Sequence, residues 1–393
     1  MHILHLASWY PDDIEPYTGD FVQRHLEAVS LFIPVTVFHI AQQGAITDIE
    51  KTVIHTYKRG ALTEHILHLR FKRSGWFFLD KLRFNWIYYA RYKSLVKAYI
   101  RDNGLPALVH AHVPMKVGVM ARWIKKTYQI PYIITEHSSA YYPAIPDNYF
   151  VKSRYHRQAV KKIYRDAVWT TVVSARLAKR LQELFGFRHY SVIHNVVNTA
   201  LFNYSGHTPP VFRFIHASTM NHPKNVEGML EVFAALKQQR TDWECVMLGW
   251  DTPALRKQCA NLQLDGMVTW RGVVSYAQVA QEMRQSSALI MFSRYENFPC
   301  AIIEALCCGL PVIATRVGGI PEAVQANNGI LVEPGNQQQL LNAMIQMMDT
   351  YGDYNRAQMA TEAQARYNYQ VVGRQLTDLY TRLCAEDAGS ARG

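Results

Sequence analysis

Two glutamates with chemical potential lie in residues 293–322. Glu296 precedes a helix that the sequence predicts over 299–308, and Glu304 lies within an otherwise apolar stretch of that helix. Charged side chains are rarely left unpaired in such surroundings, so a polar group must face Glu304. That group is either protein, such as an arginine or backbone, or a bound ligand. The neighbouring residues favour a ligand.

The predicted start of the helix suits an anion. Pro299 fits the first helical position, where its missing N–H costs nothing. The N–H groups of Cys300, Ala301 and Ile302 then point out of the first turn, where a phosphate could bind. Glu304 lies roughly 7.5 Å further along the axis, at about 1.5 Å per residue. This offset fits one molecule with phosphates at the helix tip and sugar hydroxyls beside the glutamate.

A glycine turn follows the predicted strand 311–315. Gly318 and Gly319 allow close backbone approach, and a third carboxylate, Glu322, comes three residues later. Residues 293–322 thus resemble the E-x(7)-E signature and G-G-x-P-E turn of retaining, nucleotide-sugar-dependent glycosyltransferases of family 4. The resemblance extends over nearly the whole chain. It implies the GT-B fold, an α/β architecture of two doubly wound Rossmann-like domains facing across a cleft.

The resemblance also implies the chemistry. The substrate is expected to be a nucleoside diphosphate sugar, with a UDP-sugar the expected donor, transferred with retention and without a further cofactor. Glu304 is expected to bind the ribose hydroxyls, Glu296 the donor sugar and phosphates, and Glu322 to support the nucleotide-sugar pocket. The expected donor-binding set is Gly19, Arg294, Asn297, Phe298, Pro299, Cys300, Ala301, Glu304 and Glu322.

Lys224 is the expected cation for the diphosphate. It follows the first predicted strand of the second domain, and a lysine there can place its charge on phosphate; a solvated surface lysine is the alternative. The segment resembles a family loop that usually carries an arginine five residues earlier. That position is Thr219 here, and Arg294 is the expected replacement. Lys224, Glu296 and His137 form the expected catalytic set.

Two residues of the first half are expected in the same cleft. His137 ends the predicted strand 132–136, and the carboxyl ends of parallel strands face the cleft. It resembles the family histidine that contacts the transferred sugar, although a histidine bonded to backbone is the common alternative. Gly19 resembles the family glycine that lets donor and acceptor approach. An ordinary turn glycine is the alternative there.

The elements that position these residues alternate between apolar strand-like runs and helical patterns, which is typical of parallel α/β proteins. Predicted elements include a strand over 66–71 and a helix over 148–164. A polar stretch with Gly206 and two prolines divides the alternation. We therefore expect a first domain over 1–202, a linker over 203–211 and a second domain over 212–368. By the resemblance, the C-terminal segment 369–393 returns to the first domain.

Composition excludes several classes of protein. The chain has 393 residues, 49% hydrophobic and 19% charged, which suits a soluble protein of two domains. No apolar run reaches the roughly 18 residues of a membrane span, and the first residues lack signal-peptide features. The six cysteines have neither zinc nor disulfide spacing, and no Asp-x-Asp follows an apolar strand. We expect no metal and a cytoplasmic location, with peripheral attachment to the inner membrane face as an option.

Positive charge is concentrated in the first half. Residues 1–200 hold 27 Lys and Arg against 14 Asp and Glu, whereas the remainder holds 15 against 17. Residues 71–97 interleave aromatics and cations, which suits an anionic membrane surface; a core-facing helix with a solvated basic side is the alternative. No nucleic-acid module is visible, so nucleic acid is not an expected partner.

These observations predict sugar transfer to a glycan or lipid-linked acceptor, as in cell-surface polysaccharide synthesis. Two rival functions stay open. A GT-B nucleotide-sugar epimerase or sugar phosphorylase would use a similar cleft. A non-enzymatic basic adaptor for membranes or nucleic acid would explain the charge but leave the buried carboxylates without a role.

Overall fold

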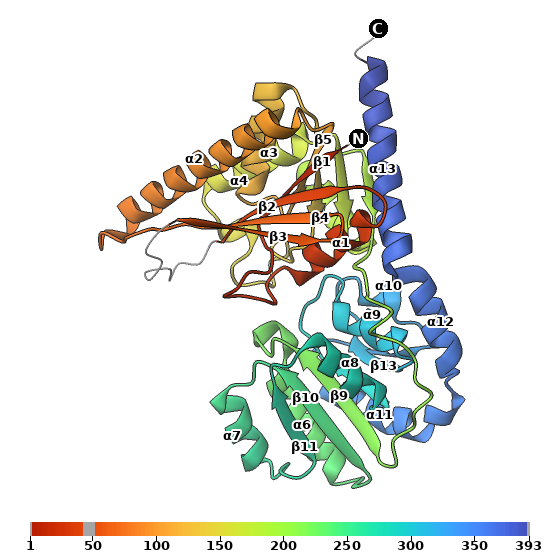
Figure 1. Cartoon of the computed structure of the whole chain (residues 1–393). Helices are drawn as coiled ribbons and strands as arrows, with labels where there is room; N and C mark the ends of the chain where they lie inside the picture. The colour runs from red at the N-terminus through yellow and green to blue at the C-terminus, as the bar shows by residue number, and fades with distance from the viewer. Residues whose placement is uncertain (1, 42–51, 391–393) are drawn as a thin grey trace.

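The computed structural model describes residues 2–41 and 52–390. They form two α/β domains, the first above the second in Figure 1. Each domain is built on its own, predominantly parallel sheet flanked by helices. The predicted α/β class with two doubly wound domains is confirmed.

The first domain contains an eight-stranded sheet in the order β3-β4-β2-β1-β5-β6-β7-β8. Its strands are β1 (Ile3–Ala7), β2 (Val35–Ala41), β3 (Val53–Arg59), β4 (Leu62–His68), β5 (Leu108–His112), β6 (Tyr132–Glu136), β7 (Trp169–Val172) and β8 (Tyr190–Val192). Its helices are α1 (Asp20–Ser30), α2 (Phe77–Asn103), α3 (Val117–Tyr128), α4 (Arg154–Asp166) and α5 (Ala175–Phe185). Every residue of the central strands β1, β5 and β6 is buried, as expected for a parallel sheet covered on both faces.

The second domain contains a six-stranded parallel sheet in the order β11-β10-β9-β12-β13-β14. Its strands are β9 (Phe212–Ser218), β10 (Trp243–Gly249), β11 (Val268–Gly272), β12 (Ala288–Met291), β13 (Val312–Thr315) and β14 (Gly329–Val332). Its helices are α6 (Val226–Lys237), α7 (Pro253–Asn261), α8 (Tyr276–Arg284), α9 (Cys300–Cys307), α10 (Ile320–Ala323), α11 (Gln337–Asp349) and α12 (Arg356–Tyr367). The strand order reverses between β9 and β12, where such folds bind ligands.

The last helix, α13 (Tyr369–Ser390), runs from the second domain along the first (Figure 1). Val372, Leu376 and Tyr380 are buried in one cluster with Val22 and Leu26 of α1. Residues 391–393 of the expected C-terminal segment lie outside the described residues. The two domains are therefore joined twice, once through residues 203–211 and once through α12 and α13.

Two elements predicted in the first domain have different bounds in the structure, and β3 was not predicted. The strand expected over 66–71 is β4, which pairs antiparallel with β3 through a turn at Gly60. β3 is mostly exposed, so it lacks the apolar signal of an interior strand. The helix expected over 148–164 is interrupted after a short 3₁₀ turn, and α4 starts afresh because the Ser153 hydroxyl caps it. Among the described helices, none is both long and apolar enough to cross a membrane.

Candidate active site

A cavity of about 620 Å³ lies between the two domains. The carboxyl edges of both sheets contribute to its walls, as the topology predicts. Its polar and functional lining includes Gly19, Asp20, Arg24 and His137 from the first domain and Lys224, Tyr276, Glu296, Cys300 and Glu304 from the second.

Glu304 has a protein partner. Its Oε1 atom accepts a hydrogen bond of 2.5 Å from Nη1 of Arg24, on α1 of the opposite domain. Both side chains are almost fully buried. Burial raises the pKa of Glu304, and the Arg24 guanidinium opposes that rise. The expectation that a ligand alone faces Glu304 is therefore corrected: an arginine 280 positions away occupies one carboxylate oxygen.

Arg24 belongs to a larger contact between the domains. Its Nη2 atom lies 3.1 Å from Oδ2 of Asp20, one turn earlier on α1. The same Asp20 oxygen accepts a hydrogen bond of 2.5 Å from the Tyr276 hydroxyl on α8. The Arg24 guanidinium carbon also lies 4.3 Å from the centre of the Tyr276 ring, a cation–π geometry. One arginine thus bridges two helices of the second domain.

Lys224 and Glu296 meet at the cavity wall. The Lys224 ammonium lies 2.5 Å from Oε1 of Glu296, which also accepts a hydrogen bond of 2.8 Å from the Ser293 hydroxyl. The backbone of Glu296 is held closely as well: a Cβ on Gly318 would lie 1.7 Å from the Glu296 carbonyl oxygen. Gly318 has φ +55°, so only glycine suits this turn on both counts. The glycine turn therefore positions the loop that carries Glu296.

The amino end of α9 faces the same cavity. Pro299, Cys300 and Ala301 line it, and α9 begins at Cys300. Pro299 is the residue before the first helical position, with ψ 127°, so its predicted place inside the helix is off by one residue. The Ile302 N–H donates to the Pro299 carbonyl, whereas the N–H groups of Cys300 and Ala301, in the first turn, have no acceptor among the described residues.

His137 lies in the cavity wall of the first domain and is held by the signature loop. Its carbonyl accepts a hydrogen bond of 2.6 Å from Nδ2 of Asn297. Its ring lies 4.7 Å from the ring of Phe21, between centres. Burial lowers the pKa of His137 well below its ordinary value, so the ring is neutral at pH 7. The neighbouring Glu136 carboxylate accepts hydrogen bonds from the His137 and Ser138 N–H groups and so shapes this loop.

Gly19 and Phe298 take different parts in the same region. Gly19 has φ +76°, and a Cβ there would lie 2.3 Å from the Trp9 carbonyl carbon, so this turn requires glycine. Phe298 packs its ring 4.3 Å from that of His194, and its carbonyl accepts a hydrogen bond of 2.7 Å from Asn195. Both residues line the cavity, as does Thr219.

Two predicted site residues do not line this cavity. Arg294 turns toward Glu227, at 2.9 Å, and donates to the His222 carbonyl, so here it does not replace the arginine that is missing at Thr219. Glu322 accepts hydrogen bonds from the N–H groups of Ala175 and Arg176. It therefore caps the start of α5 across the domain boundary. Carboxylates near a helix start are commonly placed this way, and only the fold reveals which helix.

Arg24, Asp20 and Tyr276 were missed by sequence reasoning. Arg24 and Asp20 follow Gly19 with helical spacing, and an arginine among the apolar residues Val22, Leu26 and Val29 of an amphipathic helix was a usable signal. Tyr276 has no comparable signal, because a tyrosine at a helix start is unremarkable. Its role depends on where the second domain meets α1.

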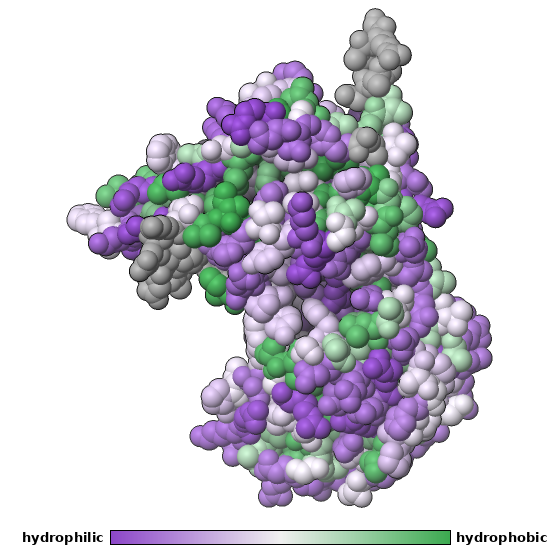
Figure 2. Space-filling model, viewed as in Figure 1, coloured by the Kyte–Doolittle hydropathy of each residue, from purple (hydrophilic) through white to green (hydrophobic). Residues whose placement is uncertain are grey.

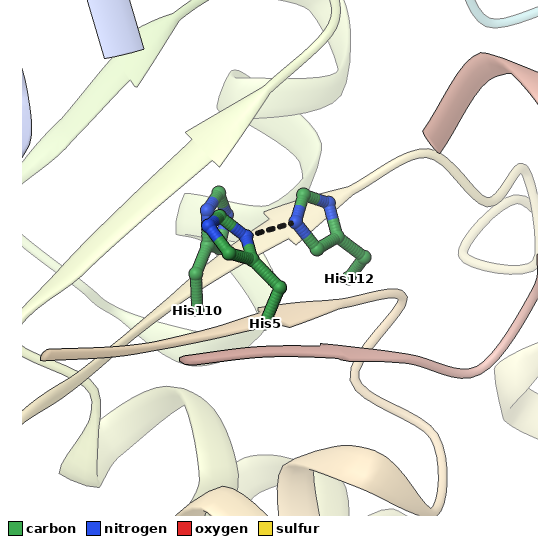
Figure 3. A group of neighbouring side chains, drawn as sticks. All are labelled: His5, His110 and His112. Atoms are coloured by element: carbon green, nitrogen blue, oxygen red, sulfur yellow. Dashed lines mark hydrogen bonds between the residues drawn. The ribbon is translucent and has the colours of Figure 1, made fainter. Parts of the chain in front are cut away.

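A cluster of buried histidines lies beside the cavity. His5, His110 and His112 project from β1 and β5 toward one another (Figure 3). The ring centres of His112 and His137 lie 6.3 Å apart, which places this cluster next to the cavity wall. His5 and His112 share a hydrogen bond of 3.2 Å. Both ring nitrogens of His110 are engaged, with the hydroxyls of Tyr380 and Thr135. The ring nitrogens of the three histidines are close enough together to hold a metal ion. Both nitrogens of His110, however, already form hydrogen bonds within the protein.

Comparisons with known proteins agree with this geometry. Residues 33–201 match the family model "Glycosyltransferase Family 4", and residues 202–366 match "Glycosyl transferases group 1". The chain belongs to this family of glycosyltransferase enzymes, which confirms the resemblance in the signature. The boundary between the two matches falls at residues 201 and 202, at the end of the first domain.

Named relatives share parts of the chain. N-acetyl-alpha-D-glucosaminyl L-malate synthase from Bacillus anthracis is 30% identical over 138 residues, 34% of this chain and 35% of that protein. D-inositol 3-phosphate glycosyltransferase from Pseudarthrobacter chlorophenolicus is 30% identical over 135 residues, 33% of this chain and 32% of that protein. The matched stretch thus spans about a third of each of these relatives.

Solved structures share the whole fold. Sucrose-phosphate synthase from Thermosynechococcus elongatus superposes with a TM-score of 0.78 at 17% identity, covering 98% of this chain and 100% of that one. HepE from Anabaena, solved in complex with UDP, superposes with a TM-score of 0.72 at 17% identity, covering 97% and 100%. At this identity the likeness establishes the GT-B fold.

Proposed function

We propose that this protein transfers a sugar from a nucleoside diphosphate donor, with a UDP-sugar expected, to a glycan or lipid-linked acceptor, with retention of anomeric configuration. The observation that carries the proposal is the arrangement of one cavity wall. Lys224, Glu296 and the amino end of α9 lie together there, and His137 enters from the opposite domain. Structures of HepE with UDP and with UDP-glucose support the choice of donor.

The positive groups on this wall match the charge that develops during transfer. Departure of the diphosphate builds negative charge on its oxygens, and fixed donors aimed there stabilise the transition state. Lys224 supplies a full positive charge, and the Cys300 and Ala301 N–H groups supply the partial positive charge at the amino end of α9. The nucleotide sugar is a substrate in this scheme, which includes no further cofactor.

Donor binding exchanges partners on this wall. Lys224 is now neutralised by Glu296. A diphosphate offers the ammonium a second anionic partner, which releases the Glu296 carboxylate to accept hydrogen bonds from sugar hydroxyls. The neutral His137 ring suits the same task from the other side, because it can donate or accept without repelling the donor.

Glu304 remains the proposed group for the ribose hydroxyls. Because Arg24 occupies its Oε1, the ribose uses the other oxygen or displaces Arg24. Either outcome links nucleotide binding to the contact between domains.

A panel of nucleoside diphosphate sugars tests the donor by thermal shift, followed by mass spectrometry of candidate acceptors. We expect one nucleotide family to stabilise the protein and the acceptor to gain one sugar mass with release of the diphosphate; NMR of the product checks retention. Sugar rearrangement without an acceptor would instead indicate an epimerase, and dependence on phosphate a phosphorylase. Failure of every nucleotide sugar to stabilise the protein would contradict the proposal.

A further inference from the structure

The amino end of α2 exposes a group of large apolar side chains. Trp76, Phe77, Phe78 and Trp86 are 73%, 83%, 70% and 74% exposed, and Leu82 between them is half exposed. Side chains of this size are normally covered in a soluble domain, and clusters of them mark interaction surfaces. No described residue covers them.

The fold holds this group away from the body of the protein. Tyr88, Tyr92 and Val96, further along α2, are fully buried, and the Tyr92 hydroxyl donates to the Phe38 carbonyl on β2. The first turns of α2 lie on the N-terminal side of this anchor and project at the left of the molecule (Figure 1). Phe78, Leu82 and Trp86 are four residues apart, so they form one row along the helix.

Cations flank the row in sequence and continue along α2. Residues 72–101 contain eight Lys and Arg against one carboxylate, Asp80, and Asp80 accepts the Ser74 and Gly75 N–H groups at the helix start. Figure 2 shows apolar and polar residues interspersed along this projection. The charge is therefore strongly positive where the apolar side chains are exposed.

A basic pocket of about 330 Å³ lies next to this surface, between α3 and α4. Its lining includes Arg122, Lys126 and Lys162 together with Trp123 and Tyr155. The Lys93 ammonium of α2 lies 5.3 Å from the centre of the Trp123 ring, which places the pocket beside α2. Tyr155 is itself 86% exposed.

We propose that this surface, the projecting turns of α2 (76–86) with the basic pocket between α3 and α4, docks the protein on an anionic phospholipid bilayer. Aromatic and leucine side chains enter the boundary between head groups and acyl chains, while cations contact anionic head groups. Leu79 and Leu82 argue against nucleic acid, because they offer bases no ring to stack on. The surface shares no residue with the interdomain cavity, so docking leaves the proposed donor site open.

Vesicle flotation tests this docking independently of sugar transfer. We expect the full chain to float with phosphatidylcholine vesicles that contain phosphatidylglycerol and to stay below with phosphatidylcholine alone. Phe77→Ser/Phe78→Ser/Trp86→Ser should lower partitioning at least about tenfold through lost apolar burial. Lys81→Glu/Lys162→Glu, with one cation from the projecting turns and one from the pocket, should lower it by about fivefold or more per cation at low salt.

Matched controls lie elsewhere on the surface. Leu105→Ser removes an apolar side chain that is 57% exposed at the far end of α2, and Lys257→Glu reverses an exposed charge on α7. Both should float like the wild type, and unchanged melting temperatures should show that all four variants fold. No flotation of the wild type, equal flotation on neutral vesicles, unchanged flotation of the two docking-surface variants, or release from vesicles by single-stranded DNA would each overturn the proposal.

Discussion

Arg24 of the first domain and Glu304 of the second form a buried ion pair across the domain boundary, with 2.5 Å between Nη1 and Oε1. Removing one member of such a pair leaves the other charge buried without a partner, which is far more costly than removing both. The pair therefore couples the contact between the domains to the proposed ribose site.

The first prediction concerns the free energy of this pair. Arg24→Met should destabilise the protein by about 3–5 kcal/mol, and Arg24→Met/Glu304→Leu should recover most of that loss. Urea unfolding of the wild type, both single variants and the double variant gives the coupling energy. Simple addition of the two single effects would show that the residues do not interact as the structure describes.

The second prediction concerns turnover. Lys224→Ala should lower kcat by roughly 10²- to 10³-fold, the usual effect of removing one donor from a developing negative charge. Because Lys224 also pairs with Glu296, the melting temperature should be measured alongside initial rates. Lys257→Ala, an exposed lysine of the same domain, serves as the control. Near-normal kcat in folded Lys224→Ala would remove Lys224 from the mechanism.

The third prediction separates Glu322 from the nucleotide. Its carboxylate accepts the first N–H groups of α5, so Glu322→Gln should cost about 1 kcal/mol of stability through the weakened helix cap. The Kd of the nucleotide donor, measured by calorimetry, should change less than about twofold. A tenfold change in Kd corresponds to about 1.4 kcal/mol, so the expected change in binding free energy is a small fraction of that. A large loss of donor affinity with unchanged stability would instead place Glu322 in the pocket.

The fourth prediction concerns pH. Burial lowers the pKa of His5 to about 3 and that of His25 to about 4, from 6.5. Below pH 6.5 the unfolded chain therefore binds protons that the folded protein excludes, so the free energy of unfolding falls as pH falls. Each such histidine contributes a slope of up to about 1.4 kcal/mol per pH unit.

His5→Asn tests this slope at one position. Between pH 6 and about pH 4 the variant should lose stability less steeply than the wild type by about one proton, measured by urea unfolding at each pH. Gln239→Asn, a change at an exposed position that does not titrate, should leave the slope unchanged. Parallel curves for His5→Asn and the wild type would contradict a neutral, buried His5.

Local patterns in the sequence were sufficient to bring together much of the cavity wall of the second domain. Short apolar runs that alternate with helical segments along the chain predict both sheets. Each run is continuously hydrophobic because a strand of a parallel sheet is buried on both faces. Glu296, the start of α9 and the turn at Gly318 lie close together in the sequence, so short-range geometry already brings them together. His137 and Lys224 could be placed because the carboxyl ends of parallel strands meet at one edge of a sheet.

What the tertiary structure alone decided is which side chains meet across the two domains. The partner of Glu304 is 280 positions away, Glu322 caps a helix 146 positions earlier, and Arg294 turns from the cavity toward Glu227. Periodicity encodes which face of a helix is buried but not which face of another domain covers it. These contacts depend on how two separately built sheets dock, and that docking is set by surface shape and charge distributed over the whole chain.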